Sequence, residues 1–224
     1  MSLNKTKCDP ELGARVNAYL TQMGVETPTV PNKLGVKEKI DVIERKINDI
    51  MTTLGLDLSD DSLAETPLRV AKMYVTETMW GLDYDNFPKC TTVENKMRYD
   101  EMVVERNINV KSQCEHHLVP IIGQAHVAYI PKDRVLGLSK IPRAVEFFAR
   151  RPQIQERLTE QVFYALEYIL GTSDIAVCIT ANHMCVSMRG VEDTSADTVT
   201  SKLGGCFKSD PAARAEFMRL ISSK

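Results

Sequence analysis

The chain has 224 residues and a formal net charge of −2, with 28 lysines and arginines against 30 aspartates and glutamates. Hydrophobic residues make up 43% of it and charged residues 26%, a globular composition that excludes a disordered or fibrous chain. The balanced charge gives no reason to expect a nucleic-acid or membrane partner. No secretion signal is visible, and no apolar run approaches the about 20 residues that are needed to span a bilayer. We therefore expect a cytoplasmic protein.

The first part of the chain predicts helices. A helix is expected over residues 10–23, and apolar residues at helical spacing predict another over residues 40–54. Thr66-Pro67 is typical of an N-cap followed by the first helical position, which predicts a third helix reaching residue 81. We therefore expect residues 1–95 to form an N-terminal helical region.

The pattern changes in residues 96–224, which we predict to form a second domain. Val- and Ile-rich alternating runs predict strands there, and longer amphipathic runs predict helices. The expected order is β-β-α-α-β-β and then a helix, over residues 102–111, 118–130, 139–151, 154–171, 174–187, 198–207 and from 210 onward. Antiparallel strands with helices segregated to one face make an α+β fold.

Cysteine and histidine cluster in two places. Three of the four histidines lie within three residues of Cys114 or Cys185, and they are His116, His117 and His183. A thiolate and an imidazole three positions apart can fold around one ion, and zinc takes Cys sulfur and His nitrogen in tetrahedral geometry. If the His-x-Cys pair lies on a strand, its two side chains point to the same face.

Two questions about this metal site stay open at this level. Spacing does not decide whether His116 or His117 is the ligand, or whether the site is a closed structural one or an open catalytic one. The competing interpretation, unrelated core thiols and hydrogen-bonded histidines, requires the clustering to arise by chance. His126 stands alone in a predicted strand and is interpreted as a structural sheet histidine, and Cys178 as a small core residue.

Five motifs closely resemble the GTP cyclohydrolase I family. They are Glu-Thr-Pro-Leu-Arg-Val-Ala-Lys-Met (65–73), Ser-Gln-Cys-Glu-His-His-Leu-Val-Pro (112–120), Gly-Leu-Ser-Lys-Ile-Pro-Arg (137–143), Arg-Pro-Gln-Ile-Gln-Glu-Arg-Leu (151–158) and Arg-Gly-Val-Glu-Asp (189–193). The likeness runs from about residue 38 to the C-terminus. It implies that residues 96–224 are a tunnelling-fold catalytic domain, in which the sheets of β-β-α-α-β-β subunits join edge to edge into a barrel. It also implies a toroidal homodecamer of two pentamers, with active sites at the subunit interfaces.

The resemblance implies a reaction and a set of residues for it. GTP is hydrolysed at C8 of the purine, formate is released, and the ribose rearranges to give 7,8-dihydroneopterin triphosphate, the first step of folate and pterin biosynthesis. Cys114, His117 and Cys185 are then the expected ligands of Zn²⁺, and water completes the tetrahedron. His183 is expected to move protons at N7 and C8, and His116 to protonate the ribose ring oxygen.

Several cations are expected to hold the triphosphate. Ser139 and Lys140 stand at a predicted helix N-terminus, where free N–H groups and the helix dipole favour phosphate. Arg143 follows one turn later and is expected to face the same ligand. The resemblance adds three more residues to this set: Arg69, Lys72 and Arg189.

The base is expected to be recognised by a carboxylate. Guanine presents adjacent N1–H and 2-amino donors, which one carboxylate can accept together, and we assign this role to Glu156. Gln155 is expected to form a hydrogen bond to the same base. Glu115, which lies between two site residues, is left unassigned, because it could orient a histidine or face solvent.

Two alternatives to this function are kept. Another tunnelling-fold pterin or deazapurine enzyme would share the barrel but is not expected to combine the two Cys/His motifs with the Ser-Lys helix. A non-catalytic zinc module would use four protein ligands, including His183, and would not need His116. A thiol redox role is weaker, because no C-x-x-C is present. Whether the product serves folate or tetrahydrobiopterin, and whether a regulatory protein or allosteric coupling acts, is left open.

Overall fold

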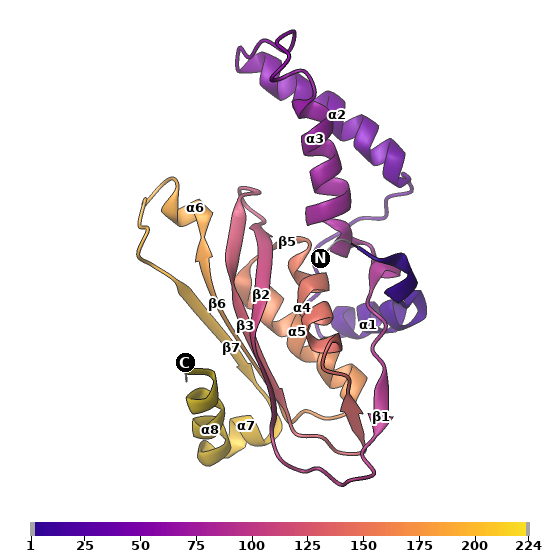
Figure 1. The fold of residues 1–224 in the computed structure, drawn as a ribbon, viewed down its shortest axis with the longest axis vertical. Coiled ribbons are helices and arrows are strands. Elements are labelled where there is room, and N and C mark those ends of the chain that lie inside the picture. The colour runs from indigo at the N-terminus through magenta and orange to yellow at the C-terminus, as the bar shows by residue number, and fades with distance from the viewer. Residues whose placement is uncertain (1–2, 223–224) are drawn as a thin grey trace.

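The computed structural model describes residues 3–222 (Figure 1). Its helices are α1 (Pro10–Gln22), α2 (Val36–Thr53), α3 (Thr66–Lys72), α4 (Lys140–Ala149), α5 (Gln155–Leu170), α6 (Met184–Ser187), α7 (Gly205–Ser209) and α8 (Pro211–Ser222). Its strands are β1 (Thr92–Glu94), β2 (Val103–Cys114), β3 (Pro120–Tyr129), β4 (Arg134–Leu136), β5 (Pro152–Gln153), β6 (Ile175–His183) and β7 (Thr198–Leu203). The predicted order is confirmed as β2-β3-α4-α5-β6-β7, in an α+β fold. None of the helices described is long and apolar enough to cross a bilayer.

Five strands form the main sheet in the order β5-β2-β3-β6-β7. Neighbouring strands are antiparallel except β5 and β2, where Gln153 lies beside Cys114 in a short parallel pairing. Neither β5 nor the separate pair of β1 and β4 is predicted, because two or three residues are too few to show alternation. β7 forms one edge of the sheet, and β5 covers only the last two residues of β2, so most of β2 forms the other edge.

Helices α4 and α5 cover one face of the sheet (Figure 1). Val127 and Val177 of the strands are fully buried beneath them, as are Phe147 of α4 and Leu158 of α5. Full burial of such side chains contributes about 1.5–3 kcal/mol each, so this layer is the main source of stability. The two helices inside the β-β-α-α-β-β unit therefore share one face, as predicted.

Helices α7 and α8 lie on the opposite face of the sheet. Phe207 and Phe217 are fully buried there and pack against Ala128, Ala176 and Cys178 of β3 and β6. Since successive strand residues point to opposite faces, this second cluster is separated from the first by the sheet itself. Cys178, 3% exposed, is the small core residue that was expected.

The N-terminal helices differ in how they pack. Val16 and Leu20 of α1 are fully buried in the main core with α4 and α5. Helices α2 and α3, which we call the arm, pack against each other and project from the body (Figure 1). Of the residues of α2, Met51 is the one that is buried. The boundary between residues 95 and 96 stays a prediction, and α1 shares its core with the sheet that follows that boundary.

The third predicted helix differs from the structure at both ends. The α-helix gives way to a π-helical segment, Met73–Thr78, and a 3₁₀ turn covers Trp80–Leu82. Apolar spacing does not reveal a π turn, because the wider turn shifts the helical face by about one residue. The prediction of Thr66 as the N-cap is also wrong by one residue. Its N–H already donates to the Leu63 carbonyl at 2.9 Å, so Thr66 begins the helix and Glu65 takes the N-cap position.

Candidate metal centre and active site

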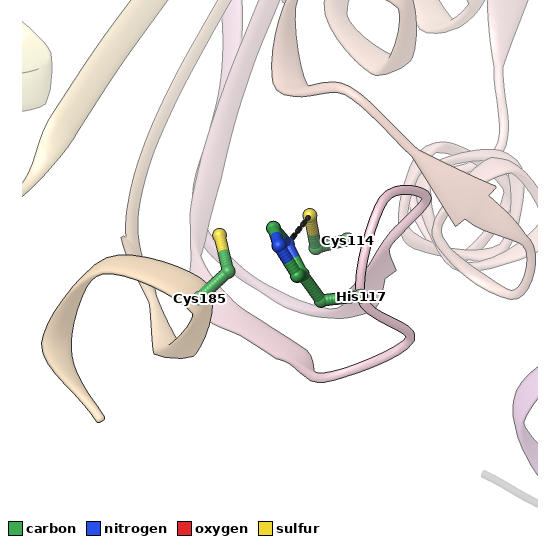
Figure 2. A group of neighbouring side chains, drawn as sticks. All are labelled: Cys114, His117 and Cys185. Carbon is green, nitrogen blue, oxygen red and sulfur yellow. Dashed lines mark hydrogen bonds between the residues drawn. The ribbon is translucent and has the colours of Figure 1, made fainter. Parts of the chain in front are cut away.

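Cys114, His117 and Cys185 form a group that could hold a metal ion (Figure 2). Each offers one ligand atom, and these atoms all lie within 4.8 Å of one another. Cys114 is the last residue of β2, His117 follows in the turn toward β3, and Cys185 belongs to α6. Two sulfurs and one imidazole nitrogen are donors that zinc favours, and their convergence fits a single ion.

The turn after β2 brings His117 to Cys114. The Leu118 N–H donates to the Cys114 carbonyl at 2.8 Å, and the Cys114 N–H donates to the Val119 carbonyl at 2.8 Å. Leu118 has a φ of +53°, the left-handed conformation that lets the chain reverse within so few residues. His117 Nδ1 then lies 3.8 Å from Cys114 Sγ (Figure 2). His116 Nδ1 is also 3.8 Å from that sulfur, but the convergent group contains His117.

Cys185 reaches the group from a helix. The strand predicted over residues 174–187 ends at His183, and Met184–Ser187 form α6. The conditional expectation that His183 and Cys185 share a strand face is therefore not met. The change from strand to helix directs Cys185 toward Cys114 (Figure 2). His183 stays at the end of β6, outside the group of three.

The Cys185 thiol lies in surroundings that disfavour its ionisation. Burial raises the pKa of Cys185, and the neighbouring Cys114 raises it further, while the charge of Arg189 opposes the shift. Two adjacent thiolates would repel each other, and a bound cation would offset that repulsion. Arg189 also lies at this site, with Nη1 3.3 Å from His117 Nε2.

The side chain of Gln155 orients the imidazole of His183. His183 Nε2 lies 2.7 Å from Gln155 Oε1. Gln155 Nε2 donates to the carbonyls of Ile179 and Thr198 and to Thr200 Oγ1, at 3.0, 2.8 and 3.1 Å. The orientation of the amide is therefore fixed by acceptors on one side and by the imidazole on the other.

The positions of Gln155 and Glu156 differ although they are adjacent in the first turn of α5. Gln155 is 2% exposed, and both hydrogens of its amide face acceptors within the chain. The expected hydrogen bond from Gln155 to the substrate's base stays a prediction. Glu156 is exposed, and its charge opposes the lowering of the His183 pKa that burial causes.

Two further residues are placed by the structure. His126 is 8% exposed and its Nδ1 accepts the Asn107 N–H at 3.4 Å, which confirms it as a structural sheet histidine. Glu115 pairs with Arg157 of α5 instead of facing solvent. Arg157 was not singled out from the sequence, and the one signal that could have found it is its place within the motif 151–158.

Comparison with known proteins gives the family. A family model for GTP cyclohydrolase I matches residues 43–222. The chain belongs to the GTP cyclohydrolase I family. Proteins named GTP cyclohydrolase 1 from Aeromonas salmonicida (strain A449) and Aeromonas hydrophila are each 58% identical over 203 residues, covering 91% of the chain and 93% of the relative. One from Shewanella sp. (strain W3-18-1) is 54% identical over 208 residues, covering 93% of the chain and 97% of the relative.

Three of the residues that GTP cyclohydrolase I is expected to use for phosphate lie far from the metal group within one chain. Ser139, Lys140 and Arg143 stand at the start of α4. The end of α4, at Ala149, leads directly into β5, which pairs beside Cys114. Because a ten-residue helix is about 15 Å long, the predicted phosphate-binding end of α4 and the metal group are separated by the whole helix.

Two more of the predicted phosphate ligands lie on the arm. Arg69 and Lys72 belong to α3, which projects from the body (Figure 1). Arg69 pairs with Glu65 at 2.9 Å on open surface. Of the predicted substrate residues, a single chain therefore brings Gln155, Glu156 and Arg189 to the histidines and the metal group. It leaves those of α3 and α4 elsewhere.

Proposed function

We propose that this chain catalyses the reaction of its family. GTP is hydrolysed at C8, formate is released and 7,8-dihydroneopterin triphosphate is formed, as the first step of folate and pterin biosynthesis. The observation that carries the proposal is the Cys114, His117 and Cys185 group with two further histidines near it in the chain. His116 Nδ1 lies 3.8 Å from Cys114 Sγ, and His183 stands two residues before Cys185. A structural zinc site uses four protein ligands and needs no such neighbours. Membership of the family supports the same reaction.

We assign Cys114, His117 and Cys185 as the ligands of Zn²⁺. Three protein ligands of this kind leave one tetrahedral position open, which is the arrangement of catalytic zinc sites. When bound there, zinc supplies Lewis acidity and lowers the pKa of a coordinated water toward neutrality. The chain presents these three side chains from the end of β2, from the turn that follows it and from α6.

His183 is proposed to move protons at N7 and C8 of the purine. Gln155 Oε1 is an acceptor, so the facing Nε2 of His183 must carry a hydrogen, and Nδ1 of the neutral ring is left to accept a proton. Gln155 supports this role as a positioning residue, because its own amide is fixed by three acceptors. A histidine held in one tautomer is ready for general base catalysis, which contributes about 10²–10⁴-fold.

His116 and Glu156 complete the site at its open side. The His116 side chain is 63% exposed, so it can reach a substrate that lies over the metal group, and we propose that it protonates the ribose ring oxygen. Glu156 is exposed in the first turn of α5, and we propose that its carboxylate accepts the N1–H and 2-amino hydrogens of guanine. Adenine offers no such pair of donors, so this contact would select the base.

The triphosphate is proposed to bind between copies of the chain. Arg189 lies beside the metal group, whereas the cations of α3 and α4 do not, so neighbouring copies are proposed to supply those residues: Arg69, Lys72, Ser139, Lys140 and Arg143. The open edges of β7 and β2 support such an assembly, because unpaired strand edges can pair with a neighbour and close a barrel. A homodecamer of two pentamers is the proposed form. Cytoplasmic location and the lack of nucleic-acid or membrane partners stay predictions of the sequence.

The test of this function is incubation of zinc-loaded protein with GTP, alongside a chelated sample. Formate and, after oxidation, pterin fluorescence are measured. Zinc-dependent formate together with a pterin is the expected result. Formate without a pterin would contradict the ribose chemistry and the role of His116. Folded, zinc-loaded protein that releases no formate would overturn the proposal in favour of a non-catalytic zinc module.

A further inference from the structure

An ion pair joins the metal-binding turn to helix α5. Arg157 Nη1 lies 2.5 Å from Glu115 Oε2, and Nη2 lies 3.4 Å from Oε1, so the guanidinium spans both carboxylate oxygens. The two side chains are only 17% and 24% exposed. An isolated ion pair on open surface does little to fix the relative orientation of the elements that it joins. A bidentate pair shielded from water holds its two elements in one orientation.

The main chain of Glu115 is tied to the same part of the molecule. Its N–H donates to the Gln153 carbonyl at 3.0 Å, and Cys114 pairs with Gln153 across β2 and β5. Glu115 is therefore held at its backbone and at its carboxylate, both times by the segment that opens α5. Because it stands between Cys114 and His117, any rotation of the turn that freed it would move both ligands.

The first turn of α5 thus anchors two parts of the site. Gln155 fixes His183 from β6, and two residues later Arg157 fixes the turn from β2. We infer that Glu115 and Arg157 are positioning residues, which set the metal-binding turn against α5 and hence against His183. This inference rests on the zinc centre proposed above. Glu115 Oε1 also lies 3.8 Å from His116 Nε2, so the same carboxylate faces the second histidine of the site.

The competing explanation is that the pair only stabilises the fold. The chain offers a matched control on the same helix, the pair of Glu160 with Lys202 of β7. Its Nζ–Oε2 distance is 2.8 Å, and the side chains are 28% and 33% exposed. It joins α5 to the sheet as the Glu115 pair does, but it has no contact with the metal-binding turn.

The experiment compares Glu115→Gln, Arg157→Gln, the double variant and Glu160→Gln as full-length, zinc-loaded proteins. The rate of zinc release to a chelator, kcat and KM for GTP, and the melting temperature of the metal-free protein are measured. Both single variants are expected to release zinc about tenfold faster or more, the size typical for partners of metal ligands, with a lower kcat. The double variant should be no worse than either single one, because each change breaks the same pair. Arg157→Lys, which keeps the charge, should recover part of the loss.

The control decides the interpretation. Glu160→Gln should release zinc and turn over like the unaltered chain, while its metal-free melting temperature falls as much as that of the Glu115 variant. Unchanged zinc release and kcat in the Glu115 and Arg157 variants would overturn the inference, as would losses that match those of Glu160→Gln or that add in the double variant. Failure of the proposed function is a separate result, in which the unaltered chain itself binds no zinc or yields no formate.

Discussion

The metal edge and the arm differ in what one chain can organise. The metal edge consists of residues 114–117, 155–157 and 183–189. There, side chains from different elements hold one another, as in the 2.7 Å contact between His183 and Gln155. On the arm, Arg69 is 71% exposed and its ion-pair partner is Glu65, one turn earlier on the same helix.

This difference separates chemistry from substrate capture. Groups that act on a reacting atom must be placed within hydrogen-bond distance, and the chain places them by internal contacts. Groups that neutralise phosphate act as charges at the end of long side chains and can be supplied by a neighbour. Substitutions at the metal edge should therefore damage every site that the altered chain forms, whereas substitutions on the arm should be open to complementation.

The largest expected effect is that of Cys185→Ala. Loss of one of three zinc ligands should leave less than stoichiometric zinc and reduce formate release by about 10³-fold or more, because the activated water is lost with the metal. Metal analysis and the formate assay measure both. Cys8→Ala, at a half-buried thiol outside the metal group, is the control and should match the unaltered chain. Full zinc occupancy in Cys185→Ala would contradict the ligand assignment.

His183→Ala should lower kcat without changing the zinc content. The variant is expected to keep one zinc per chain and its fold, because His183 is bound to Gln155 and stands outside the metal group. Turnover should fall by about 10²–10⁴-fold, the range for a lost general base. Zinc content and kcat are the measurements. Loss of zinc from this variant would mean that His183 is a ligand.

Arg69→Ala should leave zinc content and kcat close to those of the unaltered chain. Its expected effect is a KM for GTP raised about tenfold, the size of one lost charge-assisted hydrogen bond to phosphate. Steady-state kinetics at saturating and limiting GTP measure the two constants. A loss of zinc would contradict the separation between the arm and the metal edge.

Mixing two damaged chains tests whether the arm serves a neighbour. Arg69→Ala and Cys185→Ala chains are unfolded together and refolded, and activity is measured at limiting GTP. If a site combines the metal edge of one copy with the arm of another, roughly a quarter of the sites should be intact in randomly mixed assemblies. No recovery beyond the sum of the separate variants would show that the arm serves its own chain.

Glu65→Gln should have the smallest effect. Both side chains of the Glu65–Arg69 pair are exposed to solvent. Loss of the pair should therefore change the free energy of unfolding by no more than about 0.5 kcal/mol. KM for GTP should stay the same or fall, because Arg69 is released toward phosphate. Urea unfolding and kinetics measure the two quantities, and a loss of several kcal/mol would show that the arm is packed more tightly than its exposure indicates.

The long elements could be predicted from the sequence because their patterns repeat. The helix expected over residues 154–171 is found as Gln155–Leu170, and the strand over 118–130 as Pro120–Tyr129. The π-helical segment Met73–Thr78 and the short helix α6 could not be predicted, since each is shorter than the window in which periodicity is visible.

The site was predictable in its chemistry and less so in its geometry. Clustering marked Cys114 and Cys185 as candidate metal ligands, but the turn that brings His117 to them depends on the left-handed conformation of Leu118, which no spacing rule requires. The residues that orient the site side chains are distant from them in the sequence. Arg157 meets Glu115 across 42 positions and Gln155 meets His183 across 28, so these contacts exist only once the sheet and α5 have packed together.

In the proposed site three protein ligands hold zinc, and His183 is left free for proton transfer. X-ray absorption at the zinc edge of the loaded protein counts the sulfur ligands, and it counts the histidine ligands by the scattering of their imidazole rings. We predict two sulfurs, from Cys114 and Cys185, and one histidine nitrogen, from His117, with an unchanged spectrum in His183→Ala. Two sulfurs with two nitrogens, one of which disappears in His183→Ala, would contradict this prediction and identify a closed structural zinc site.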